Sequence, residues 1–109
     1  MTMDAFRALG REYSVEILEA AGEPKSAQQL SEELDVPIAT CYRRINELAE
    51  NGLLEECERR GERSGRETLY RRTVDAVTVE FAPSLSVATK PRDRIRAAFD
   101  TAWRTLAEG

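Results

Sequence analysis

Residues 26–54 read SAQQLSEELDVPIATCYRRINELAENGLL, and this stretch determines the predicted fold. Ser26, followed three residues later by Gln29, is the pattern of a capping box, in which each side chain satisfies a free backbone N–H of the other residue. The pattern predicts a helix that begins at this point and buries Leu30 and Leu34 on one face.

The sequence Asp-Val-Pro at 35–37 predicts the end of that helix and the start of the next, because proline is favoured at the first helical position. The second helix is expected from Pro37 to Asn51. Its apolar residues recur at i, i+4 and i+7 and are expected to face inward: Cys41, Ile45 and Leu48. Two helices therefore meet across a three-residue turn, as in a helix-turn-helix.

The residues before this pair also predict helix, from Asp4 to Ala21, with an interruption near Gly10. The residues after it predict a β-hairpin: a β-prone stretch runs to Arg60, a polar loop covers 61–66, and a second strand covers 68–74. A hairpin in this place is the wing of a winged helix-turn-helix.

Beyond the wing, Val77, Val79 and Phe81 alternate with polar residues and predict a strand, which a turn at Pro83-Ser84 could join to a second short strand. A last helix is expected to open at Pro91 and to run to about Leu106. It carries an apolar stripe that we assign to a dimer interface: Ile95, Phe99, Ala102, Trp103 and Leu106.

The expected fold is therefore α+β and mainly α, a winged helix-turn-helix with a β-hairpin wing and a C-terminal dimerisation helix. We divide it into a DNA-binding domain at 1–75 and a dimerisation segment at 76–109. With Cys41, Ile45 and Leu48 inward, the outer face of the second helix can read base edges in the major groove, Arg43 by a bidentate contact to guanine. The expected DNA contacts on this helix and on the wing are Ala39, Thr40, Tyr42, Arg43, Arg44, Asn46, Arg59, Arg60, Arg63 and Arg66.

The order of these segments resembles the arsenic-repressor-like (ArsR) winged-helix regulators. The resemblance is carried by ALG at 8–10, VEIL at 15–18, SAQQLSEEL at 26–34, TCYRRINEL at 40–48, NGLL at 51–54 and LYR at 69–71. The resemblance implies a homodimeric transcriptional regulator that binds double-stranded DNA. Metal-sensing members carry Cys-x-Cys in the helix that corresponds to 26–34. This chain has neither Cys nor His there, so we expect no metal and no cofactor, and the effector is left unassigned.

Charge and composition narrow the possible functions. The chain has 109 residues and a net charge of −4, yet residues 59–72 hold six Arg and two Glu, a local excess of +4. A polyanion would be expected to touch that segment. Without His or a glycine-rich phosphate loop, an enzyme is not expected. No apolar run could span a membrane and no signal peptide opens the chain, so we expect a cytoplasmic protein.

The basic residues comprise 14 Arg and only two Lys, against 20 acids, a composition that suits a halophilic, haloarchaeal cytoplasm. The competing interpretation is a winged helix that serves only as a protein–protein interaction module, without direct DNA binding. Glu47 and Glu50 on the outer helix face favour that alternative, whereas Arg43 and Arg66 favour DNA.

Overall fold

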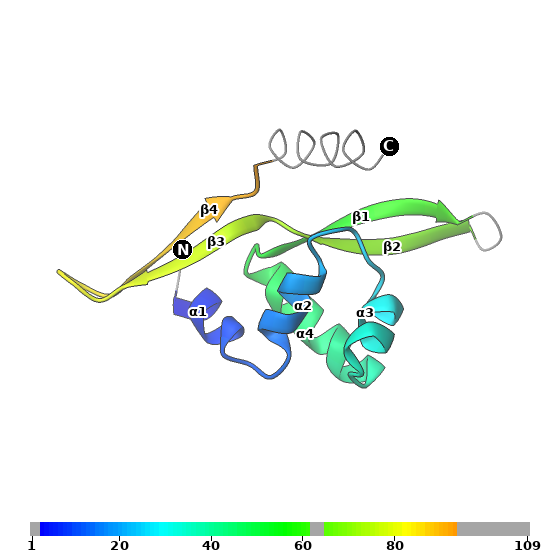
Figure 1. Cartoon of the computed structure of the whole chain (residues 1–109), viewed down its shortest axis with the longest axis horizontal. Helices are drawn as coiled ribbons and strands as arrows, with labels where there is room; N and C mark the ends of the chain where they lie inside the picture. The colour runs from blue at the N-terminus through cyan, green and yellow to red at the C-terminus, as the bar shows by residue number, and fades with distance from the viewer. Residues whose placement is uncertain (1–2, 62–64, 94–109) are drawn as a thin grey trace, which may run out of the picture.

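The computed structural model describes residues 3–61 and 65–93. Within these residues, four helices are followed by two antiparallel β-hairpins (Figure 1). This α+β order confirms the predicted winged helix-turn-helix fold. The predicted C-terminal helix lies outside the described residues, apart from its expected start at Pro91.

The first two helices are α1 (Met3–Leu9) and α2 (Ser14–Ala20), and the interruption predicted near Gly10 separates them. Gly10 N donates to Arg7 O over 3.1 Å, and Tyr13 takes a left-handed conformation with φ of 71°. The turn brings both helices onto the same core, where Ala8 and Ile17 are buried.

The helix-turn-helix consists of α3 (Ala27–Leu34) and α4 (Ile38–Glu50). The predicted capping box is confirmed at the start of α3: Gln29 N donates to Ser26 Oγ over 3.1 Å, and Ser26 N donates to Gln29 Oε1 over 2.8 Å. Asp35, with φ of 54°, ends α3 in the left-handed region and turns the chain toward α4.

The core lies around α4, which contacts each of the other three helices and the first strand. Cys41, Ile45 and Leu48 are fully buried, as their spacing predicted, and they pack with residues such as Ile17 and Leu30. Burial of each large aliphatic side chain stabilises the fold by about 1.5–3 kcal/mol. The inner face of α4 is therefore fixed by the core, and its other face is left for function.

The first hairpin is the wing, formed by β1 (Leu54–Gly61) and β2 (Gly65–Arg72). The strands pair in register from Leu54 opposite Arg72 to Gly61 opposite Gly65. At the base of the wing, Tyr70 exchanges two backbone hydrogen bonds with Lys25, over 2.8 and 3.0 Å. These bonds join the wing to the residue that precedes the capping box of α3.

The second hairpin, β3 (Val74–Glu80) with β4 (Ser86–Pro91), projects from the helices in the direction opposite to the wing (Figure 1). We call residues 74–91 the arm. The expected start of a helix at Pro91 is wrong, because Pro91 ends β4 opposite Val74. A proline is tolerated at a strand end, and Arg92 N then donates to Thr73 O over 2.9 Å. Within the described part of the chain, no helix has the length and apolar character needed to cross a membrane.

Candidate nucleic-acid interface

The outer face of α4 presents most of the side chains expected to contact DNA. Ala39, Arg43 and Asn46 are exposed, Tyr42 is 48% exposed, and Thr40 is half-buried. This arrangement follows from helical periodicity, because burial of the i, i+4, i+7 stripe turns the remaining positions outward. The exposed face thus combines a guanidinium, an amide, a hydroxyl and a methyl group.

Arg44 is placed differently from its neighbour Arg43. Its side chain is only 11% exposed, and its Nη1 donates to both carboxylate oxygens of Glu47, over 2.8 and 2.7 Å. Its Nε is buried without a hydrogen-bond partner in the described structure. Arg44 is thus engaged within α4, and the charge of Glu47 is neutralised by a residue of its own helix.

The wing carries the other expected DNA contacts near its tip. Arg59 and Arg60 lie on β1, Arg66 lies on β2, and the register sets Arg60 opposite Arg66. Arg63 and the side chains of the other three arginines lie outside the described residues. The backbone alone therefore places basic residues on both strands at the outer end of the wing.

A small hollow between α4 and the wing contains residues that the sequence analysis did not select. Its volume is about 250 Å³, and its lining includes Gln28 from the first turn of α3, Tyr42 from α4 and Thr68 from β2. Tyr70 also lines the hollow, and burial is the main cause of the raised pKa of its phenol. Only the tertiary packing brings these elements together, so the sequence carried no local signal for them.

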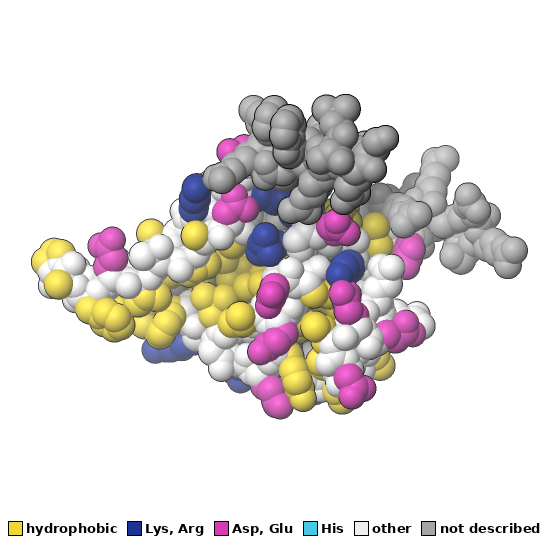
Figure 2. Space-filling model, in the orientation of Figure 1, with side chains coloured by type: hydrophobic (Ala, Val, Ile, Leu, Met, Phe, Trp, Pro, Cys, Tyr) yellow, Lys and Arg dark blue, Asp and Glu magenta, His cyan; other side chains and the backbone are white. Residues whose placement is uncertain are grey.

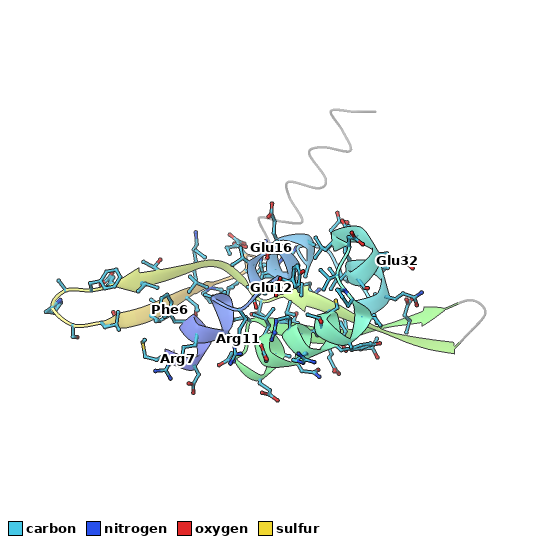
Figure 3. The ribbon with its side chains drawn as sticks, turned by 90° about the horizontal axis from the view of Figure 1, so that it is seen from below. Phe6, Arg7, Arg11, Glu12, Glu16 and Glu32 are labelled. Atoms are coloured by element: carbon cyan, nitrogen blue, oxygen red, sulfur yellow. The ribbon has the colours of Figure 1, made fainter. Side chains whose placement is uncertain are left out.

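Acidic side chains gather on α2 and α3. Figure 3 shows Glu12, Glu16 and Glu32 on this part of the molecule, and Glu16, Glu19 and Glu33 line a groove of about 550 Å³. Lys25 Nζ contacts Glu33 Oε2 at 2.7 Å beside that groove. Like charges repel a polyanion, so the groove is unfavourable for nucleic acid, in contrast to the arginine-bearing α4 and wing.

Neither cysteine belongs to a metal-binding group in the described residues, where no three or more His, Cys, Asp or Glu side chains are placed so that they could hold a metal ion. Cys41 is fully buried, and its Sγ lies 3.5 Å from the carbonyl oxygen of Ala27. Burial raises the pKa of the Cys41 thiol. Cys57 is half-buried on β1 opposite Leu69.

Comparison with known proteins supports a helix-turn-helix fold. Residues 6–57 match a family described as a helix-turn-helix domain. No curated protein matches the chain significantly. A solved structure described as a possible transcriptional regulator from Methanosarcina mazei Go1 has 15% sequence identity and a TM-score of 0.52. The similarity covers 97% of this chain and 79% of that one, and at this identity it shows a shared fold.

Proposed function

We propose that this protein is a sequence-specific, homodimeric transcriptional regulator of the ArsR-like type, which acts on double-stranded DNA in the cytoplasm of a halophile. The observation that carries the proposal is the exposed outer face of α4 beside a wing with basic residues on both strands. The match of residues 6–57 to a helix-turn-helix domain supports it. The proposed role involves no catalysis, cofactor or membrane.

Base reading is assigned to α4. Arg43 can donate two hydrogen bonds to O6 and N7 of guanine, Asn46 can pair with adenine, and the Ala39 methyl group can contact thymine. Thr40 and Tyr42 offer hydroxyl groups to phosphates or base edges. Because Arg44 is paired with Glu47, it has a supporting role in this scheme and holds the carboxylate away from the DNA.

Backbone contact is assigned to the wing. Arg59, Arg60, Arg63 and Arg66 would neutralise phosphates or enter a neighbouring minor groove, and such contacts add affinity without direct sequence reading. Thr68 and Gln28 line the hollow between the wing and α4 together with Glu67, and their hydroxyl and amide groups could donate to a phosphate oxygen at the edge away from that carboxylate. The wing and the hollow thus extend the interface from the groove to the backbone.

Residues 1–75 form the DNA-binding domain in this proposal, and 76–109 provide the dimer interface. The apolar stripe of the expected C-terminal helix consists of Ile95, Phe99, Ala102, Trp103 and Leu106. A two-fold dimer would present two copies of α4 about 34–36 Å apart, which is one turn of B-DNA. The expected binding site is therefore an inverted repeat.

The alternative is a winged helix that binds only another protein. Exposed Glu50 and the acids of α2 and α3 favour it. Glu47 no longer does, because its carboxylate accepts both hydrogen bonds from Arg44. The alternative requires that Arg43 and the wing arginines have no role on DNA.

Selection from a pool of random duplexes, followed by fluorescence anisotropy on the enriched sequence, tests the proposal. The buffer contains potassium chloride at the lowest concentration at which circular dichroism shows a folded chain. The concentration is kept low because salt weakens contacts to phosphates. We expect the wild-type protein to enrich an inverted repeat. Arg43→Glu should lose this enrichment, and Glu19→Gln should retain it. Absence of both enrichment and bulk DNA binding by the folded protein would support the interaction module instead.

A further inference from the structure

Ile38 is an exposed apolar residue at the first position of α4, directly after Pro37. It is 44% exposed and lies outside the core cluster. Isoleucine also has a lower helix propensity than alanine. Neither core packing nor helix formation therefore accounts for an isoleucine here, and its exposed surface is available to a partner.

Ile38 belongs to a small apolar surface at this end of the helix. Tyr42, which is 48% exposed, lies one helical turn further along the same side, and Ala39 is exposed next to Ile38. We call Ile38, Ala39 and Tyr42 the apolar end of α4. The exposed polar residues Arg43 and Asn46 follow it along the helix. One end of the outer face is thus suited to apolar contacts and the middle to hydrogen bonds.

The charge pattern favours approach of a polyanion to this end of α4. Residues 36–46 contain two Arg and no acid, in a chain with 20 acids. Elsewhere, acidic side chains are scattered over the helices on the face shown in Figure 2. The last turns of α4 carry Glu47, which is paired with Arg44, and exposed Glu50. Because carboxylates repel phosphates, the N-terminal half of α4 is the part that DNA can approach most closely.

The chemistry of the major groove identifies the base that suits Ile38. Among the four bases, only thymine carries a methyl group in that groove, whereas the other edges present hydrogen-bond donors and acceptors. In a helix-turn-helix, the first residues of the second helix contact base edges. The side chain of Ile38 can bury a methyl group but would leave a polar base edge without a hydrogen bond.

We propose that Ile38 makes the protein specific for thymine at one position of each half-site, by burying the C5 methyl group. Arg43 lies five residues further along α4, about 7.5 Å at 1.5 Å per residue. The thymine is therefore expected about two base pairs from the guanine that Arg43 contacts. This inference rests on the base-reading role of α4 in the proposed function, and it adds a residue and the base that this residue selects.

Replacement of single thymines by deoxyuridine in the selected duplex tests this contact, because only the methyl group is removed. Fluorescence anisotropy should show that wild type loses affinity about threefold to fivefold at one thymine of each half-site, as expected for one methyl group removed from an apolar contact. Ile38→Ala should bind the thymine duplex more weakly and should no longer distinguish thymine from uracil at that position. Alanine favours the helix, so this variant should fold, and circular dichroism checks this.

Val15→Ala is the matched control, since Val15 is also β-branched, is 55% exposed and lies on α2, outside the proposed interface. It should keep both the affinity and the thymine preference of wild type. A thymine preference that persists in Ile38→Ala, or that is absent from wild type on its enriched site, would overturn this inference while leaving the proposed function in place. If the folded wild-type protein enriches no sequence, the proposed function and this inference are both wrong.

Discussion

The guanidinium of Arg72 donates from Nη1 to the carbonyl oxygen of Leu18, 54 residues earlier in the chain, over 3.0 Å. Its Nε donates to Val74 O over 2.8 Å, and its backbone N donates to Ala21 O over 2.8 Å. The last carbonyls of a helix have no partner within it, and a positive charge there is favourable. Arg72 thus fastens the end of α2 to the junction between the wing and the arm.

The first prediction compares Arg72→Met with Arg71→Met. Loss of Arg72 removes two charge-assisted hydrogen bonds to half-buried backbone, so we expect the free energy of unfolding to fall by about 1.5–3 kcal/mol. Arg71 pairs with Glu55, and the two side chains are 31% and 35% exposed, so solvent screens the pair and its contribution is about 0.2–1 kcal/mol. Chemical denaturation measures both. A larger loss of unfolding free energy in Arg71→Met than in Arg72→Met would refute the role of Arg72 in joining α2 to the strands.

Substitution of Arg43 should mainly affect DNA affinity, whereas substitution of Arg44 should mainly affect the stability of the fold. Arg43→Ala is expected to weaken binding to the selected site by about 1–3 kcal/mol and to relax preference at one base position. Arg44→Ala should mainly lower the melting temperature, because it leaves the half-buried Glu47 carboxylate unpaired. Anisotropy on single-base variants and thermal denaturation are the measurements. An equal loss on every DNA sequence in Arg43→Ala would contradict base reading.

Arg66→Ala is expected to weaken binding to all duplexes alike. If Arg66 contacts a phosphate, its removal reduces the magnitude of the slope of log K against log salt by about one unit. Affinity measured at four or more salt concentrations gives this slope. Glu19→Gln on the acidic groove is the control and should leave the slope unchanged. An unaltered slope in Arg66→Ala would remove this part of the wing from the DNA.

The two cysteines should differ in reactivity. Burial raises the pKa of Cys41 above its ordinary value of 9.0, so its thiol stays protonated and inaccessible, whereas half-buried Cys57 should react first with an alkylating reagent. Because the folded pKa of Cys41 exceeds the unfolded one, its contribution to stability is complete below pH 9 and is lost as pH rises through the folded value. Alkylation followed by peptide mass spectrometry decides the order. Faster labelling of Cys41 would contradict it.

Removal of residues 94–109 should shift the protein toward monomer. The shortened chain ends at Asp93, so it keeps both strands of the arm. Phe99→Asp should have the same effect, because a carboxylate in an apolar interface is unfavourable in both copies. Thr101→Asp, on the opposite side of the expected helix, is the control. Light scattering measures the oligomeric state. If the shortened chain dimerises as the wild-type protein does, the C-terminal helix is not part of the interface.

Local patterns were sufficient to predict much of the fold. Gly10 predicted the break between α1 and α2, the Ser26–Gln29 pair predicted the start of α3, and the stripe from Cys41 to Leu48 predicted the buried face of α4. Each of these signals lies within a few residues of the feature that it determines. These signals depend on local backbone preference and on helical periodicity, and the tertiary structure agrees with both.

Features that depend on distant neighbours were not predicted correctly. Pro91 suggested a helix start, but pairing with Val74 holds it in a strand. The hollow lined by Gln28 and Thr68 combines residues 40 positions apart. In each case the deciding contact comes from packing that no short window of sequence contains.

The two hydrogen bonds between Lys25 and Tyr70 have a consequence for how such a chain can evolve. Both are main-chain bonds, so any residue except proline can make them. Position 25 can therefore change its side chain while the angle between the wing and α3 is kept, whereas the side chain at position 70 must also fit the core cluster in which Tyr70 packs. Main-chain bonds of this kind can persist while the sequence diverges, so the exposed residues of α4 can change without a change in the arrangement of α3 and the wing.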